Sequence, residues 1–147
     1  YLAKGAALPI ALFIIVVMAL VGAELVRLTT DASQGVVHEV IGQRAYNAAR
    51  SGAEIFLVQL FAHNSDAEEA LCQARTPGVL PSQNPDVSPH LNQFTTPGLA
   101  DCSAKVFCDV AEIENTTHFR IVSQGSCDAG GMIYTKELLL EASDLVL

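Results

Sequence analysis

The strongest constraint on this chain is an uncharged, apolar run over residues 6–23 (AALPIALFIIVVMALVGA). As an α-helix with a rise of about 1.5 Å per residue, this run would be roughly 27 Å long, which nearly matches a bilayer core of about 30 Å. Lys4 and Gly5 precede the run, and Glu24 and Arg27 follow it. The run therefore predicts one membrane-spanning helix over residues 6–23.

A secretory signal peptide is the alternative interpretation, because it also carries an apolar stretch, usually of about 7 to 15 residues. The run here is longer, and apolar and small residues continue beyond it at three- and four-residue steps, which is the spacing of one helical stripe. The stripe consists of Leu25, Leu28, Ala32, Val36, Val37, Val40, Ile41, Ala45, Ala48, Gly52, Ile55, Phe56 and Leu60. We therefore predict one continuous helix over residues 6–62, with its first half in the membrane.

Pro9 favours a helix that starts near Ala6. Proline is tolerated in the first turn of a helix, where its missing N–H would be unpaired anyway, but costs about 3 kcal/mol in the interior. If the chain is cut between Gly5 and Ala6, Pro9 becomes the fourth residue and lies in that first turn. Without the cut, a helix that begins before Gly5 would be kinked at Pro9.

This N-terminal layout resembles that of the type IV pilin family. There, prepilin peptidase removes a short basic leader that ends in Gly, and a mostly apolar helix and a small C-terminal domain follow. The resemblance implies a leader of residues 1–5, cleavage between Gly5 and Ala6, methylation of the new amine, and assembly with other pilins through the N-terminal helix. Family members usually carry Phe after the cleavage and Glu at the fifth mature position, whereas this chain has Ala6 and Ile10. Such departures are typical of minor subunits rather than of the major fibre protein. Because Ile10 cannot neutralise the amine of a neighbouring subunit, we expect this chain at a filament tip or in an initiation complex.

Two later segments resemble biogenesis proteins of the MSHA-type adhesion pilus. They are the pattern Ala104, Val106, Cys108 and residues 119–127 (FRIVSQGSC). The resemblance extends over the whole chain in loose motifs and implies the inner-membrane pilus assembly machinery as a further partner. The alternative is a permanently anchored periplasmic protein that scaffolds this machinery without entering a filament.

The charge distribution indicates the topology and excludes one class of partner. Lys4 precedes the span, so the N-terminus should stay in the cytoplasm and the domain should lie in the periplasm or on the pilus. Arg27 on the far side weakens this signal, but Glu24 can pair with it one turn back. Residues 63–147 hold 12 acidic and 4 basic residues, which accounts for the whole net charge of −8. Such a domain repels nucleic acid.

The even number of cysteines predicts two disulfides in an exported domain. Cys102 and Cys108 lie on one expected strand about 20 Å apart, beyond the reach of a bridge of about 7 Å. A hairpin turn at Asn115-Thr116 would place Cys127 near Ala104, close to Cys102, which favours the pairing of Cys102 with Cys127 and of Cys72 with Cys108. The swapped pairing stays open if a bulge shifts the register. A zinc site is a weaker alternative, since there is no C-x-x-C motif.

The remaining chain predicts a small α+β domain over residues 63–147. Five of the six prolines fall in a loop over residues 76–100, where they exclude regular structure; a partner-binding role for this loop is an alternative. Alternating or apolar patterns predict strands over residues 104–113, 119–123 and 133–142, joined by short turns. The predicted fold is a long N-terminal helix packed on a small antiparallel sheet, as in type IV pilins.

No pattern in the sequence points to catalysis or to a cofactor. The histidines fit no ligand-pair spacing, and no nucleophile or phosphate-loop motif is present. The four histidines are His38, His63, His90 and His118. Convergence of Asp101, Asp109 and Asp128 on calcium is an alternative without a spacing signature. We therefore expect a structural protein without enzyme activity, metal or cofactor.

Overall fold

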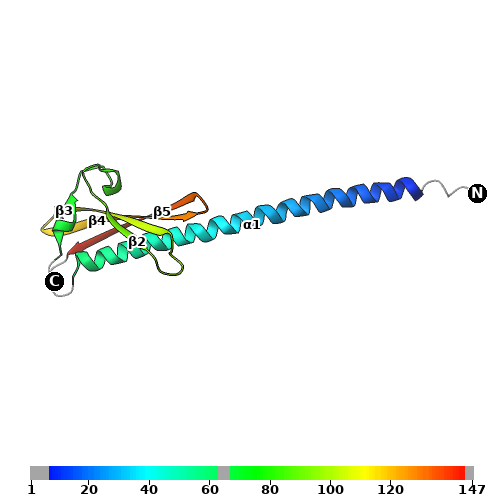
Figure 1. Ribbon diagram of the computed structural model, residues 1–147. Helices are drawn as coiled ribbons and strands as arrows, with labels where there is room; N and C mark the ends of the chain where they lie inside the picture. The colour runs from blue at the N-terminus through cyan, green and yellow to red at the C-terminus, as the bar shows by residue number, and fades with distance from the viewer. Residues whose placement is uncertain (1–6, 63–66, 145–147) are drawn as a thin grey trace, which may run out of the picture. The chain divides into compact units, whose positions relative to one another are not determined.

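The structure, a computed structural model, describes residues 7–62 and 67–144 (Figure 1). The predicted leader of residues 1–5 and the cleavage position at Gly5 and Ala6 lie outside the described residues. The chain divides into two compact units, Tyr1–Glu39 and Val40–Leu147, which are described separately below. It is an α+β protein with one apolar N-terminal helix and a mixed sheet.

The helix α1 spans Ala7–Leu60, 54 residues, close to the predicted bounds of 6–62. Pro9 lies in its first turn, where its missing N–H breaks no hydrogen bond. The last turn closes with a bond of 2.9 Å from the Phe61 N–H to the Leu57 carbonyl. A short 3₁₀ turn η1 (Glu69–Leu71) follows later in the chain.

Five strands form one sheet in the described part of the chain. They are β1 (Gln73–Ala74), β2 (His90–Phe94), β3 (Cys102–Ile113), β4 (Thr116–Ala129) and β5 (Met132–Asp144). The long strands β3, β4 and β5 form an antiparallel meander, as predicted, while β1 and β2 share the other edge of β3. The prediction of a purely antiparallel sheet is wrong, because β1 runs parallel to β3.

The prediction that prolines exclude regular structure over residues 76–100 is also wrong. Pro81 begins a 3₁₀ turn η2 (Pro81–Gln83), a position at which a proline ring fits. The strand β2 fits between Pro89 and Pro97, so it contains no proline and can pair fully with β3. The loop therefore contributes an edge strand that its proline content does not predict.

The β3–β4 hairpin turns one residue earlier than predicted, at Glu114-Asn115 instead of Asn115-Thr116. Both turn residues are left-handed, with φ of 50° and 62°, as a two-residue type I′ turn requires. Moving the turn by one residue shifts the register by two. As a result, Cys127 lies directly opposite Cys102 and not opposite Ala104.

Small residues allow the helix to pack very closely on the sheet within Val40–Leu147. A Cβ added to Gly125 on β4 would collide with the Ala45 carbonyl oxygen and the Ala49 nitrogen of α1. Likewise, a Cβ added to Gly52 would lie 2.5 Å from the Ala104 side chain. The Ser123 hydroxyl donates a 2.6 Å hydrogen bond to the Ala49 carbonyl across this contact.

Larger side chains fill the core near the end of α1. Phe56 and Leu60 pack with Val106, Phe119 and Ile121 from the sheet, and all five are buried. Most of the predicted apolar stripe over this half of α1 is buried as expected. The prediction differs from the structure in two respects over Val40–Leu60: the stripe omits the buried Ala49 and Ala53, and it includes Val40 and Ile55, which are exposed.

Candidate functional site

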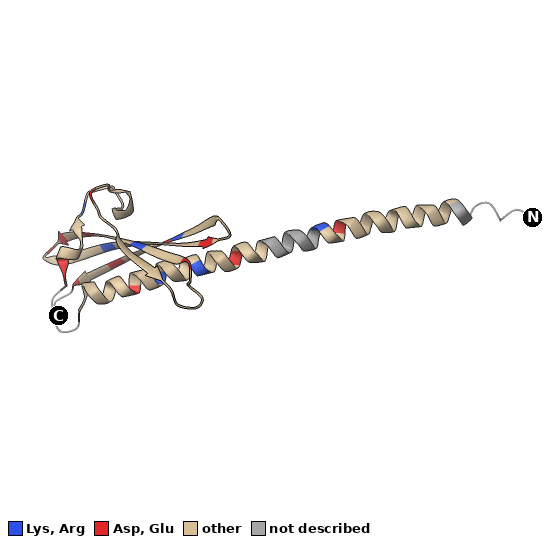
Figure 2. Ribbon diagram, in the orientation of Figure 1, with Lys and Arg blue, Asp and Glu red and all other residues tan. Residues whose placement is uncertain are grey.

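The first candidate site is the helical segment Pro9–Arg27. Its mean hydropathy is 2.6, and it is long and apolar enough to cross a membrane. Figure 2 shows this part of α1 without charged residues until Glu24 and Arg27. Its large apolar side chains are 40–70% exposed: Ile10, Leu12, Phe13, Ile14, Ile15, Val16, Val17, Met18, Leu20, Val21, Leu25 and Val26. A helix that is apolar on all sides needs an apolar environment, which lipid or other helices can supply.

The charged end of this segment is an exposed ion pair. Glu24 and Arg27 lie 3.6 Å apart one turn from each other, so the pairing expected from the sequence is confirmed. Both side chains are more than two-thirds exposed, so the pair stabilises the helix only weakly. A similar exposed pair joins Arg50 to Glu54, and this hydrogen bond raises the pKa of the Arg50 guanidinium.

The most buried charged group of the domain is Asp109, a residue that the sequence suggested only as a calcium ligand. Its side chain is 3% exposed. One carboxylate oxygen accepts a 2.8 Å bond from Arg75 Nε, and the other accepts bonds of 3.1 and 2.5 Å from Arg120. The two arginine side chains are only 22% and 16% exposed. Asp109 is therefore the centre of a half-buried cluster of two positive charges and one negative charge.

This cluster fastens the proline-rich loop to the face of the sheet opposite α1 (Figure 1). Arg120 donates a 2.5 Å bond to the Val79 carbonyl of the loop, and Arg75 donates one of 3.3 Å to the His118 carbonyl on β4. Pro81 and Val87 of the loop are buried, and η2 packs against β3 and β4. The sheet is thus covered by the helix on one face and by this loop on the other.

The other two aspartates of the calcium hypothesis have separate structural contacts. The Asp101 carbonyl accepts a 3.1 Å bond from the Asp128 N–H, and the Asp128 carboxylate accepts a 3.0 Å bond from the Gly131 N–H. Asp109 is occupied by the two arginines. Within residues 7–62 and 67–144, no group of three or more His, Cys, Asp or Glu is placed to hold a metal ion.

The histidines do not come together either. The His90 ring lies 4.9 Å from the Phe56 ring, and its Nε2 lies 3.1 Å from the Leu71 carbonyl oxygen. His118 lies on β4, and its carbonyl accepts the bond from Arg75. His38 is exposed on α1, while His63 lies outside the described residues. His90 is partly buried and therefore packs against Phe56 at the edge of the core.

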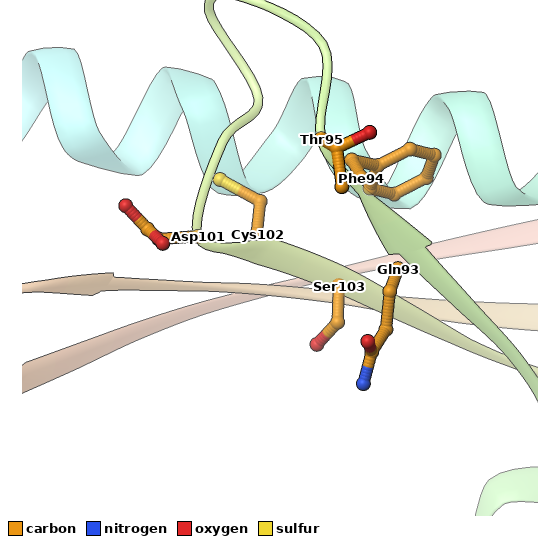
Figure 3. A pocket seen from close by; sticks show the side chains of 6 residues that line it. All are labelled: Gln93, Phe94, Thr95, Asp101, Cys102 and Ser103. Carbon is orange, nitrogen blue, oxygen red and sulfur yellow. The ribbon is translucent and has the colours of Figure 1, made fainter.

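A hollow of about 350 Å³ lies beside the junction of β2 and β3. It is lined by Gln93, Phe94, Thr95, Asp101, Cys102 and Ser103. In Figure 3, Gln93 and Ser103 point to one face of the sheet while Phe94 points to the other, so their side chains do not converge. The hollow offers no set of groups that would hold a reacting molecule.

The loop beside this hollow is held by α1. Arg44 donates bonds of 2.9 Å to the Gly98 carbonyl and 2.7 Å to the Ala100 carbonyl. Gly98 has a φ of 92°, which favours glycine at this turn. Since both of these bonds go to backbone carbonyls of the same loop, Arg44 fixes the connection between β2 and β3.

Two disulfides close the domain. Cys72 is bonded to Cys108 with a Cα separation of 4.7 Å, and Cys102 to Cys127 with a Cα separation of 4.0 Å. These are the two pairings that the sequence favours. The first holds the segment after α1 against β3, and the second joins β3 to β4.

Comparison with known proteins identifies no relative: no protein-family model, curated protein or solved structure gives a significant match.

Proposed function

We propose that the chain is a minor, pilin-like structural subunit of a bacterial type IV pilus system. Within such systems, its motifs around Cys108 and Cys127 resemble those of the MSHA pilus biogenesis protein MshP. The proposal places the protein in the inner membrane with one span, an N-terminus in the cytoplasm and a domain in the periplasm, or in the extracellular pilus. Its partners would be other pilins, prepilin peptidase and the assembly machinery.

One observation carries this proposal. A single continuous helix is apolar and exposed on all sides over Pro9–Arg27, whereas its residues from Ile41 to Leu60 form the core of a folded domain. One element can therefore serve both as a membrane anchor and as part of the domain. In an assembling filament, the exposed segment would exchange contacts with lipid for contacts with neighbouring helices, which are comparably apolar.

The residues of the first helical turns favour a place at the filament tip or in an initiation complex. In pilins, the Glu at the fifth mature position is thought to neutralise the N-terminal amine of an adjoining subunit, and this chain has Ile10 there. Glu24 does not replace it, because it lies about 21 Å further along the helix and pairs with Arg27. A subunit of this kind could have its own amine neutralised by a neighbour but could not return the interaction. That asymmetry suits an end position in few copies.

A structural role also fits the charged groups of the domain. The best-buried charges, Asp109 with Arg75 and Arg120, bond to one another and to backbone, and so hold a loop in place. The protein would act by associating with its partners through α1 and the domain surface, and would catalyse no reaction.

The decisive experiment is the intact mass of the full-length protein extracted from the membrane of its native host. We expect a chain that begins at Ala6 with a methylated amine, and a longer, unprocessed chain for Gly5→Glu. Gly42→Ala, which changes a glycine of the folded domain, should mature like the wild type. A wild-type protein that keeps residues 1–5 would support a permanently anchored scaffold instead. A Gly5→Glu variant with the mature mass would contradict the pilin proposal.

A further inference from the structure

The last strand, β5, leaves one side of the sheet open. It lies at the end of the strand order, and no other described segment pairs with its outer side. Its 13 residues make it more than twice as long as an average strand of about five or six. A long open edge offers a row of backbone N–H and C=O groups to any extended segment that can approach it.

The hairpin geometry identifies the residues whose backbone groups face this edge. The turn between β4 and β5 consists of Gly130 and Gly131, with φ of 64° and 87°. In a two-residue turn of this type, the flanking pair Ala129 and Met132 is hydrogen-bonded, so alternate residues from Met132 onward bond to β4. The residues between them direct N–H and C=O to the open side: Ile133, Thr135, Glu137, Leu139, Glu141 and Ser143.

Two observations on the neighbouring hairpin agree with this assignment. By this alternation, the backbone N–H and C=O of Cys127 bond to β5. Cys127 and Cys102 on β3 should therefore form a non-hydrogen-bonded pair, in which the two Cα atoms lie closer together than in a hydrogen-bonded pair. Their Cα separation is 4.0 Å. The next residue, Asp128, donates its N–H to the Asp101 carbonyl on the β3 side, as the alternation requires.

Lys136 limits where a new strand can pair. Its side chain lies on the face of the sheet that packs on α1, and a Cβ at Gly42 would lie 3.7 Å from its Cε. A charge that points to the inner side of an edge strand obstructs pairing next to it. Beyond Lys136 the inner residues are Leu138, Leu140 and Ala142, which carry no charge. The open part of the edge is therefore residues 137–143, called the 137–143 edge below.

Acidic side chains determine what can dock there. Glu137 accepts a 2.7 Å bond from Gln124. Glu141 lies opposite Arg120, whose Nε and Nη2 bond to Asp109 and Val79. Leu139 lies between the two glutamates on the same face and is 51% exposed. A strand that presents a basic residue, an apolar residue and a basic residue to this face would complement it.

A second copy of the chain fits this edge poorly. In any two-fold antiparallel pairing centred on the 137–143 edge, Glu137 or Glu141 lies directly or diagonally opposite a glutamate of the other copy. Like charges in these positions are destabilising. The net charge of −8 adds further repulsion between copies and attracts basic segments.

We propose that the 137–143 edge of β5 is a docking site for an extended basic-apolar segment of a different protein, which adds a strand to the sheet. The backbone of the segment would bond to residues 137, 139, 141 and 143, and its basic side chains would face Glu137 and Glu141. This site is separate from the assembly surface of α1. It therefore stands or falls independently of the pilus function proposed above.

The test uses full-length protein in detergent micelles and a fluorescent, end-blocked peptide that contains Lys-Val-Leu-Val-Lys within flanking Thr residues. We expect saturable binding, and at least tenfold weaker binding of a scrambled peptide with adjacent lysines. Leu139→Pro removes one open N–H without touching the β4 ladder and should weaken binding at least tenfold. Ile133→Pro is the matched control: it also removes an open N–H, but outside the 137–143 edge, and should bind like the wild type.

A charge swap keeps the proposal testable if Leu139→Pro fails to fold. Glu137→Lys combined with Glu141→Lys should weaken the binding of the lysine peptide by up to about fivefold for each charge pair. The same variant should bind more tightly to a peptide in which both lysines are replaced by glutamate. Equal binding of the scrambled peptide, no binding at millimolar concentration, or unchanged binding by a folded Leu139→Pro variant would overturn the proposal. So would self-association that Leu139→Pro abolishes, because the occupant would then be a second copy.

Discussion

Replacing Asp109 with Asn tests whether the two-arginine cluster holds the domain together. The substitution keeps the volume of the side chain but removes its charge and one of its two acceptor oxygens. The amide NH₂ group must then face an arginine donor, either Arg75 Nε at the 2.8 Å position or Arg120 at the 2.5 and 3.1 Å positions. Two guanidinium groups that are mostly buried would lose their common counter-ion.

The expected cost follows from the number and burial of these bonds. Each hydrogen bond to a charged group contributes about 1.5–3 kcal/mol. Measured losses for breaking a buried pair are about 3–5 kcal/mol, less than the sum of three such bonds, because the partners relax toward water. We take the lower figure for Asp109, since the two arginines retain some exposure. For a domain of this size, a cost of about 3 kcal/mol corresponds to a fall in Tm of roughly 12–24 °C.

Thermal unfolding of the full-length protein in detergent, followed by circular dichroism of the sheet, would measure the effect of Asp109→Asn. The proline-rich loop should also become sensitive to protease below Tm, because Arg120 would no longer be held where it bonds to the Val79 carbonyl. Glu54→Gln is the matched control, since it removes one carboxylate from an exposed pair and should leave Tm close to the wild-type value. If Asp109→Asn melts within about 2 °C of the wild type and its loop stays protected, the cluster does not stabilise the domain as argued.

Three further outcomes are expected. Removing the disulfide of Cys72 and Cys108, which closes a loop of 36 residues, should lower the free energy of unfolding by about 3–4 kcal/mol and expose the domain to proteolysis. Strains without periplasmic oxidation should lose the protein likewise. Labelling of four free thiols in stable, folded protein would contradict this. Gly52→Ala should destabilise the domain by about 1–3 kcal/mol through overpacking against the sheet. Gly42→Ala, where a Cβ would make only an ordinary contact of 3.7 Å with Lys136 Cε, should stabilise the domain by up to about 1 kcal/mol. Equal unfolding temperatures of the two variants would show that the close helix–sheet contact is not limiting. Because of Ile10, a tagged, functional copy should appear at one end of sheared pili or only at the cell surface, and regular labelling along the shaft would refute the end position.

Features that depend on local composition and periodicity could be predicted from the sequence. An uncharged run ending before Glu24 is sufficient to define a helix that can span a membrane. Alternation along residues 104–113 identified the central strand, because successive side chains in a strand point to opposite faces. The even number of cysteines and the strand geometry favoured the pairing of Cys102 with Cys127 that the structure has.

Features that depend on contacts between distant segments could not be predicted from the sequence. The exact register of the hairpin depended on left-handed backbone at Glu114 and Asn115, which no pattern of apolar residues reveals. The strand β2 exists because β3 offers it an edge, although prolines surround it. Asp109 became the centre of the loop attachment because folding brings Arg75 and Arg120 to it from separate strands and loops. Local patterns report the preferences of a segment, whereas register, edge pairing and buried charge contacts are selected by what the fold places next to that segment.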